Sequence, residues 1–320
     1  MSSFFLNGTY YILASNAKLF ATQGLATKNI DLLQTDHRLL KLKALRKCGS
    51  NAFDRNYAGG GAVYYDAPSG VLIQLYHGEF WYGNGAAYTS LGIAVSRDLG
   101  NSWKKLGQVL SVAAPRMHGC QSDIGNGSLL SKSDGYVYAY YSDLTPSCVG
   151  VSIGLARAKL SDIVNAARAG TKLPHPGQLF MKYHNGNFSQ PGVIDTSRPA
   201  LGGGFFTPMF STHTDGWPTM SLVAYDSVIQ QYVMTYVAGW NQHNETGVAL
   251  RFSPDRIHWS DPTSFNFGQT TFYPSLVNTS GGDPNILGAH FYIYFVYPFP
   301  GVSTQNLMRA LITVSAGPSR

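Results

Sequence analysis

The sequence predicts an all-β fold built from repeated units. Short runs of β-branched and aromatic residues alternate with turn residues along the 320-residue chain, without sustained helical periodicity. Gly (35), Tyr (20) and Phe (17) are abundant and only 12% of residues are charged, which is typical of all-β proteins with many turns. Five hairpin units follow one another. Such repeats favour a five-bladed β-propeller forming one domain, residues 1–320, over an irregular β-sandwich.

The best-preserved unit spans Gly59 to Gly107. Its first two strands, Ala62–Tyr65 and Val71–Tyr76, flank a turn that contains Asp, Pro, Ser and Gly, and a third apolar run covers Leu91–Val95. We therefore expect an antiparallel hairpin followed by a third strand, the arrangement of one propeller blade.

The third run leads into a polar turn of eight residues, Ser-Arg-Asp-Leu-Gly-Asn-Ser-Trp, at positions 96–103. The side chains of Asp98 and Ser102 can satisfy backbone N–H groups of this turn, and Gly100 permits a positive φ. Trp103 can pack back over the hairpin. We interpret Asp98 as a turn former rather than a catalyst. The octet fits the Asp-box pattern and resembles the Asp boxes of sialidase-type propellers.

The strands expected in the other units share this apolar and aromatic composition. They cover Phe4–Leu6, Tyr10–Ala14 and Lys18–Thr22 in the first unit, Ser128–Leu130, Tyr136–Tyr141 and Val149–Ala156 in the third, Met220–Tyr225, Gln231–Trp240 and Val248–Phe252 in the fourth, and Phe272–Val277, His290–Tyr297 and Leu307–Val314 in the fifth. We expect Leu307–Val314 to close the ring beside the N-terminal unit, because free edges would expose unpaired strands.

Two further local features interrupt the strand pattern. A Ser cap and helical spacing predict a short helix over Leu160–Ala169. Residues 253–259 form a shortened copy of the octet, in which Arg256 replaces the expected Gly. We expect Trp103 and Trp259 each to be buried against its own hairpin.

Charge and cysteine content narrow the function classes. The net charge is +6, but only residues 41–47 form a basic cluster, which we interpret as a solvated face, so no nucleic-acid partner is expected. No run of about 18 apolar residues exists, so no membrane span is expected. Cys48, Cys120 and Cys148 lack metal-ligand spacing. We expect the three cysteines to be buried free thiols. A disulfide between Cys120 and Cys148 is the alternative.

The first 14 residues lack a basic n-region and a small-residue cleavage site, so they are interpreted as a strand. The expectation is a secreted or extracytoplasmic protein whose leader is absent from this chain. A cytoplasmic location is the alternative, and the oligomeric state is left open.

The order of the strands within each unit predicts where the candidate functional residues lie. The segments before the first strand and after the second strand of each hairpin share a face, and in a propeller that face holds the central funnel. Carboxylates on these segments include Asp54, Asp123 and Asp143, together with Glu79 and Glu245, which are the only glutamates of the chain. Paired carboxylates beside aromatic rings are what glycosidic bond cleavage requires.

We predict that Glu79, Asp123 and Asp54 are the catalytic residues and share one solvent-accessible pocket at the axis, with Asp143 and Glu245 nearer its rim. Crowding by carboxylates and an aromatic ring should raise the pKa of Glu79, so Glu79 is assigned as the acid and Asp123 as the base or nucleophile. The residues expected to bind substrate are Arg55, Tyr57, His77, Trp81, Arg116, His118, Arg198 and Trp240. Arg198 lies in an insertion, residues 181–206, whose alternative role is an elongated outer connection.

Four segments, residues 54–66, 75–79, 92–103 and 122–143, resemble the five-bladed glycoside hydrolases of the clan that contains families 43, 32 and 130. The resemblance implies a glycan or polysaccharide substrate, an Asp and a Glu in the funnel, and no cofactor, with room for a structural calcium ion. Asp123 matches the carboxylate that precedes a strand in these enzymes. Glu79 matches no motif and is a candidate acid only because of its position. Enzymes of family 43 place an Asp that acts as the base in the first blade, but this sequence has no Asp before Phe4. The resemblance therefore assigns the role of the base to Asp54.

Two other functions fit the same scaffold. One is a non-catalytic propeller that binds carbohydrate or protein, because fold alone does not give function. The other is a lyase or phosphorylase for acidic sugars, in which Arg55, Arg116 and Arg198 would form a basic pocket. The sialidase motif Phe-Arg-Ile-Pro is absent.

Overall fold

The structure is a computed structural model. It describes residues 2–6, 9–14, 18–23, 38–41, 52–81, 87–100, 102–113, 124–131, 134–143, 151–194, 202–210, 218–238, 247–269, 271–279, 283, 285–298 and 305–316. The strands of these residues form five sheets, which we number along the chain. The predicted all-β class is confirmed.

Sheets 1 and 2 are each four-stranded meanders. Sheet 1 contains β1 (Ser2–Leu6), β2 (Thr9–Ala14), β3 (Lys18–Gln23) and β4 (Arg38–Lys41), and sheet 2 contains β5 (Tyr57–Asp66), β6 (Val71–Trp81), β7 (Ala87–Ser96) and β8 (Lys104–Leu110). Every pairing within them is antiparallel.

Sheets 3, 4 and 5 differ in strand number. Sheet 3 contains β9 (Ile124–Ser131), β10 (Tyr136–Asp143), β11 (Ser152–Lys159), β12 (Met181–His184) and β13 (Asn187–Pro191). Sheet 4 contains β14 (Thr219–Asp226), β15 (Gln231–Ala238), β16 (Gly247–Ser253), β17 (Thr263–Asn266) and, parallel to β14, β19 (Ile286–Leu287). Sheet 5 contains β18 (Phe272–Asn278), β20 (His290–Pro298) and β21 (Gln305–Thr313).

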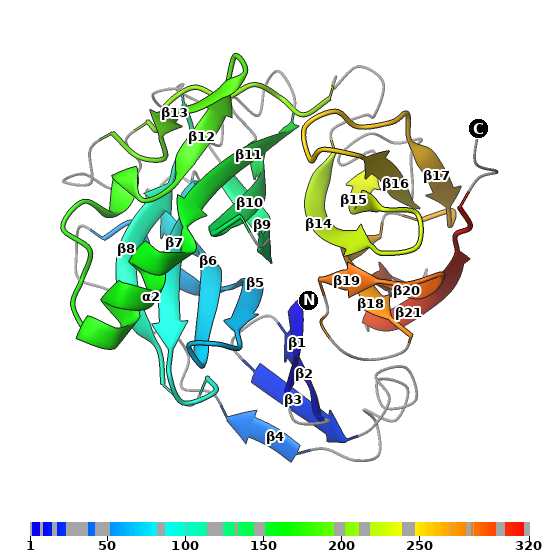
Figure 1. The fold of residues 1–320 in the computed structure, drawn as a ribbon, viewed down its shortest axis with the longest axis horizontal. Helices are drawn as coiled ribbons and strands as arrows, with labels where there is room; N and C mark the ends of the chain where they lie inside the picture. Colours follow the sequence, from blue (N-terminus) through cyan, green and yellow to red (C-terminus); the bar gives the residue numbers. More distant parts are fainter. Residues whose placement is uncertain are drawn as a thin grey trace.

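The five sheets surround a common centre, with the first strand of each sheet on the inside (Figure 1). The inner strands contact one another in chain order: β1 contacts β5, β5 contacts β9, β9 contacts β14, and β14 contacts β18. The fold is therefore propeller-like, and the segments that precede the inner strands converge from distant parts of the sequence.

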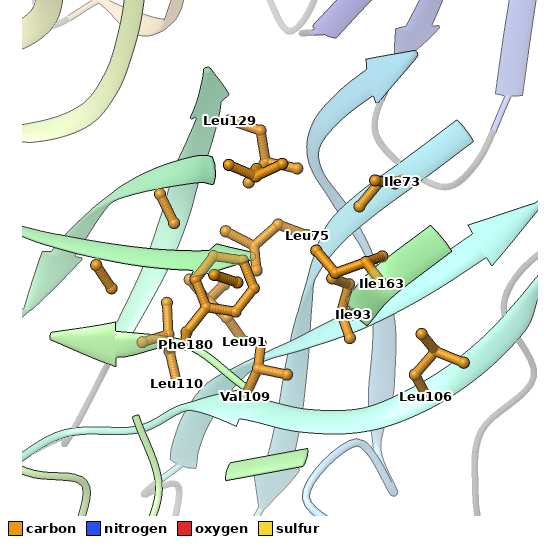
Figure 2. Packing of buried hydrophobic residues seen from close by; sticks show 14 of the residues in the cluster. Ile73, Leu75, Leu91, Ile93, Leu106, Val109, Leu110, Leu129, Ile163 and Phe180 are labelled. Carbon is orange, nitrogen blue, oxygen red and sulfur yellow. The ribbon is translucent and has the colours of Figure 1, made fainter. Parts of the chain in front are cut away.

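The core lies between neighbouring sheets. Leu75, Leu91 and Ile93 of sheet 2 pack in one buried cluster with Leu129 of sheet 3 (Figure 2). Val137 of sheet 3 belongs to the same cluster. Because side chains alternate across a strand, the intervening positions face the other way. Tyr76 and Ala94 accordingly pack with Phe53 and Trp103 on the opposite face of sheet 2. The middle strands are buried on both faces, which explains their nearly continuous apolar sequence.

Helix α2 (Leu160–Ala169) has the bounds that the sequence predicts. Its N-cap, however, is Lys159, which makes no side-chain capping bond, and Ser161 lies inside the helix. The helix buries Ile163 beside Ile93 of sheet 2 and ends at Gly170, whose φ of 62° suits glycine (Figure 2). A single 3₁₀ turn, η1, follows at Pro176–Gln178.

The turn at residues 96–103 is held by its own polar side chains. Ser96 Oγ accepts the backbone N–H of Gly100 at 2.8 Å, and Asp98 Oδ1 accepts that of Ser102 at 2.8 Å. Gly100 has a φ of 86°, as the turn requires. Trp103 is half-buried against Tyr76 of its own sheet. Asp98 is therefore engaged within the turn.

The turn at residues 253–259 also contacts the neighbouring sheet, which the sequence does not predict. Arg256 has a φ of 80° in the position expected for Gly, and its guanidinium lies 2.9 Å from Asp134 of sheet 3. Trp259 is half-buried and contacts Tyr140 of sheet 3 edge-to-face, at 5.9 Å between ring centroids. The cluster against which Trp259 packs includes Tyr232 and Met234 of its own sheet as well as Tyr140, so the tryptophan contacts its own sheet as expected and also joins sheet 4 to sheet 3.

The expected closure by terminal strands was wrong. β21 pairs with β20 and is the outer strand of sheet 5, whereas β1 pairs with β2 and is the inner strand of sheet 1. Within the described residues, no ladder joins β21 to sheet 1. Each terminal strand pairs with its neighbour in the chain, and such local pairing closes a short loop at low entropic cost.

Candidate functional site

The candidate site lies where β5 begins and β6 ends. These strands are antiparallel, and Tyr57 lies directly opposite Glu79. The backbone N–H of Asn56 donates to the carbonyl of Glu79 at 2.9 Å, and Asn56 Oδ1 accepts the N–H of Trp81 at 2.9 Å. The predicted juxtaposition of these two segments is thus confirmed. Six residues expected at this site lie outside the described residues: Arg116, His118, Asp123, Arg198, Trp240 and Glu245.

Glu79 is held between two partners on its own strand. Residues 77, 79 and 81 share one face of β6, because alternate side chains of a strand point the same way. His77 Nε2 lies 3.3 Å from Glu79 Oε1, and Trp81 Nε1 donates to Glu79 Oε2 at 2.5 Å. The carboxylate keeps about a quarter of its side-chain surface exposed (24%), so a ligand can reach it.

These contacts hold the pKa of Glu79 below its ordinary value. The hydrogen bond from His77 is the largest cause, and the bond from Trp81 adds to it, while partial burial acts in the opposite direction. The expectation of a raised pKa was therefore wrong, because the described side chains that contact this carboxylate are hydrogen-bond donors. Glu79 is ionised near neutral pH and suits the role of a base or nucleophile rather than an acid.

Aromatic and basic side chains surround this carboxylate. The ring of Tyr57 lies 6.2 Å from that of His77, centroid to centroid. Burial first, and then the charge of Glu79 and the phenol of Tyr273, raise the pKa of Tyr57, so its hydroxyl stays protonated. Trp81 is 57% exposed and presents a wide apolar surface. The guanidinium of Arg55, an exposed residue, lies 5.8 Å from the ring centroid of Phe80, whose side chain points to the opposite face of β6 from Glu79.

Asp54 does not share this surface. It is fully buried, and its Oδ2 lies 2.5 Å from Lys105 Nζ and accepts the hydroxyl of Tyr76 at 3.0 Å. A Cβ added to Gly78 would lie 2.8 Å from the Cβ of Asp54, so Asp54 packs on the face of β6 that Gly78 presents. Glu79, the next residue, points to the opposite face. The expectation that Asp54 lines the solvent-accessible pocket was wrong: Asp54 is half of a buried ion pair.

The start of β9 is fixed to the strand beside Glu79. Thr89 lies opposite Glu79 on β7, and its Oγ1 accepts the backbone N–H of Ile124 at 2.9 Å. Ile124 is the residue that follows Asp123 in the sequence. Ile124 in turn pairs with Asp143, which is 2% exposed. Asp143 is therefore a buried residue and not the exposed rim carboxylate that the sequence predicts.

A buried lysine links three segments near Asp143. Lys182 Nζ donates to the carbonyl oxygens of Ser111 at 2.5 Å and Gly204 at 3.1 Å, and it lies 5.4 Å from the ring centroid of Tyr141. Burial lowers the pKa of Lys182 to about 8, while the charge of Asp143 opposes the shift. These bonds tie the outer hairpin of sheet 3, where the insertion begins, to the end of sheet 2. Residues 181–194 thus form an outer connection of sheet 3, which is the alternative role given above for the insertion.

One residue of this region was missed by the sequence analysis. Tyr273, in β18 of sheet 5, is 40% exposed and acts on the pKa of Tyr57. The available signal was Pro274, because proline within a strand is confined to edges and bulges. The pairing of β18 with β20 is indeed shifted between Phe272 and Ser275.

The described residues offer neither a cluster of metal ligands nor a membrane-spanning helix. No three His, Cys, Asp or Glu side chains lie close enough together there to hold a metal ion. Nor does that part of the chain contain a helix of sufficient length and apolarity to cross a membrane.

No protein-family model matches the sequence, and no curated protein matches it. Solved structures do resemble the fold. An α-L-arabinanase mutant from Cellvibrio cellulosa superposes with a TM-score of 0.56 at 11% identity, covering 96% of this chain and 89% of that chain. An exo-1,5-α-L-arabinanase from a bovine ruminal metagenomic library gives 0.55 at 11% identity, with coverages of 96% and 90%.

A family 43 glycoside hydrolase from Bacillus licheniformis also superposes, with a TM-score of 0.55 at 12% identity, covering 97% of this chain and 70% of that chain. All three resemblances are at the level of the fold. The chain therefore has a propeller-like fold that is similar to glycoside hydrolase structures.

Proposed function

We propose that the chain is a glycoside hydrolase in which residues 1–320 form one five-bladed propeller, with each of the five sheets as a blade. The observation that carries the proposal is the ionised carboxylate of Glu79, held by His77 and by the exposed indole of Trp81 where β5 begins and β6 ends. The likeness of the fold to arabinanases and other family 43 structures supports it. The turns at 96–103 and 253–259 are then two Asp boxes.

Glycoside hydrolysis needs a second carboxyl group, which we assign to Asp123. Its neighbour Ile124 is bonded to Thr89, the residue opposite Glu79, and consecutive Cα atoms are about 3.8 Å apart. This anchor supports placing Asp123 within the same site. Because Glu79 is ionised, the roles are reversed relative to the sequence-based assignment: Glu79 is the base or nucleophile and Asp123 the acid.

In the inverting form of the reaction, Glu79 takes a proton from water while the water oxygen bonds to the anomeric carbon. The bond from that carbon to the leaving oxygen breaks, and Asp123 protonates the leaving oxygen. In the retaining form, Glu79 itself attacks the anomeric carbon while the bond to the leaving oxygen breaks and Asp123 protonates that oxygen. Asp123 then takes a proton from water, whose oxygen displaces Glu79 from the anomeric carbon and releases the sugar. Carboxyl groups about 5–5.5 Å apart would imply retention, and about 6.5–9.5 Å inversion.

The substrate proposed is a polysaccharide such as arabinan, with Trp81 stacking on a sugar ring. The reaction needs no cofactor, and we propose a secreted or extracytoplasmic location. Arabinofuranosides come first in a substrate panel, because two of the similar structures are arabinanases by name.

The test is a panel of aryl glycosides and polysaccharides assayed with wild type, Glu79→Gln and Trp81→Ala. Glu79→Gln should lower kcat/KM by about 10²–10⁴-fold, the typical contribution of a positioned acid or base. Trp81→Ala should mainly raise KM. Asp261→Asn, at an exposed carboxylate after the second turn, is the matched control and should behave as wild type. Binding of a panel member without any cleavage would support a non-catalytic carbohydrate-binding propeller instead.

A further inference from the structure

The inner strands of four sheets share a β-bulge near their first residues. The register shifts by one residue between 59 and 62 on β5, between 125 and 128 on β9, between Thr219 and Leu222 on β14, and between Phe272 and Ser275 on β18. A bulge re-aims the side chain of the extra residue, and bulges are frequent beside active sites. The repeated bulges mark the start of each of these strands as a place where side chains are redirected.

In β18 the bulge holds Tyr273 in a strained conformation. Its φ is 52°, in the left-handed region that disfavours residues other than glycine. Met220, in the bulge of β14, has a φ of 56°, and its Sδ accepts the backbone N–H of Tyr273 at 3.4 Å. Such conformations persist only where the surrounding structure enforces them, and they cluster at ligand sites.

The strained backbone directs the ring of Tyr273 to solvent. Tyr273 is 40% exposed, whereas Thr271, Ser275 and Met220 are all less than 10% exposed. The ring therefore does not fill the core. A tyrosine presented in this way offers a ligand both an apolar ring face and a hydroxyl group.

The exposed phenol belongs to the surroundings of Glu79, although it comes from another sheet. Tyr57, which lies opposite Glu79, is the first residue of β5, and Tyr273 is the second residue of β18, so both lie at the starts of inner strands. The start of β18 is bonded to Met220 at the start of β14, and the N–H of Met220 donates in turn to Ser142 Oγ of sheet 3 at 3.0 Å. The electrostatic effect of Glu79 and Tyr273 on the pKa of Tyr57 agrees with this placement. Side chains from sheets 2 and 5 therefore face the same end of the ring. Among the described residues, this end presents aromatic rings, hydroxyl groups and His77 around the ionised carboxylate of Glu79.

We propose that Tyr273 is a substrate-contacting, specificity-determining residue, which packs its ring on a sugar bound beside Glu79 and selects neutral over acidic sugars. The inference rests on the proposed glycosidase function. Selection follows from charge: the ionised carboxylate of Glu79 repels a uronic acid, while the rings of Tyr273, Tyr57 and Trp81 favour the apolar face of a neutral sugar.

Tyr273→Gly is the decisive variant, because glycine accepts the positive φ and removes the ring without leaving backbone strain. We expect an unchanged or higher Tm, a KM at least 10-fold higher on the aryl glycoside that wild type cleaves fastest, and a kcat within about threefold of wild type. Tyr273→Phe should give a smaller rise in KM. A uronic-acid glycoside of the same linkage should be cleaved at least 10-fold more slowly by wild type.

Gln230→Gly is the matched control. Gln230 is an exposed residue with a φ of 55° in the turn between β14 and β15, so this variant relieves the same strain away from the site. It should match wild type in KM. The inference would be overturned if Tyr273→Gly had the KM of wild type. It would also be overturned if the variant lost Tm and kcat together, as a structural role would predict. Glu79→Gln tests the proposed function separately in either case. A preference for the uronic-acid glycoside would overturn the selection of neutral sugars, and a wild type without activity on any panel member would remove both proposals.

Discussion

His77 Nε2 lies 3.3 Å from Oε1 of Glu79, and the two side chains occupy the same face of β6. The contact joins positions two residues apart, so the strand itself sets its geometry. It is also the largest cause that lowers the pKa of Glu79. The state of the candidate base therefore depends on a neighbour that the strand places beside it.

Replacing His77 should shift the pH dependence of activity. A base must be ionised, so activity is lost as the pH falls through the pKa of Glu79. His77→Ala removes the main cause of the depressed pKa, so the acidic limb of the kcat/KM profile should move to higher pH. His175→Gln, at an exposed histidine before η1, is the control and should keep the wild-type profile. An unmoved acidic limb in His77→Ala would contradict the role given to this hydrogen bond.

The ion pair of Asp54 and Lys105 should govern stability rather than catalysis. Lys105→Met leaves the buried carboxylate of Asp54 without its cation and should cost about 3–5 kcal/mol in urea denaturation. Adding Asp54→Asn in the double variant should recover part of this loss. At a temperature where it stays folded, Asp54→Asn should keep the wild-type kcat/KM, and a loss comparable to that of Glu79→Gln would restore Asp54 as a catalytic residue.

Arg256 should reveal the cost of its backbone conformation. Both Arg256→Ala and Arg256→Gly remove the contacts with Asp134, but only glycine relieves the φ of 80°. The alanine variant should therefore be less stable than the glycine variant by about 1 kcal/mol in thermal or urea unfolding. Equal stabilities of the two variants would mean that the left-handed backbone carries no measurable strain.

Lys182 should make stability rise with pH. Its folded pKa of about 8 lies below the ordinary value of 10.5, so above pH 8 the folded state loses this proton before the unfolded state does. Stability then increases as the pH rises, by about 2 kcal/mol between pH 8 and 10. The measurement is the difference in unfolding free energy between wild type and Lys182→Met, because that difference cancels the titration of tyrosines. A pH-independent difference would refute the assignment.

Strands and turns could be predicted because their signals are local. The hairpin around residues 66–70 and the bonds of Asp98 follow from residue types at short spacing, and the pairing of Tyr57 with Glu79 follows from hairpin topology. The contact of Trp259 with Tyr140 of sheet 3 depends on how neighbouring sheets pack against each other, for which the sequence carries no comparable signal.

The site was predictable only in part, for a related reason. Topology placed Asp54 and Glu79 at the same end of one hairpin, but the side-chain direction of Asp54 is set by Gly78 and by Lys105 of β8. Likewise, Glu79 has a lowered pKa because His77 and Trp81 donate to it, although the composition of the loops predicts crowding by carboxylates. Tyr273 joins the site through a bulge in sheet 5, a contact that no short-range pattern reports.

Sheets 1, 2 and 3 are each assembled from one uninterrupted stretch of chain, and the described strands include none shared between the first sheet and the last. Among the described strands, only β19 crosses a boundary, by pairing with β14 of sheet 4 while lying between β18 and β20 in the sequence. A circular permutant opened between β8 and β9 would therefore keep every described ladder intact. The architecture is modular in the first three sheets and interlocked between the last two.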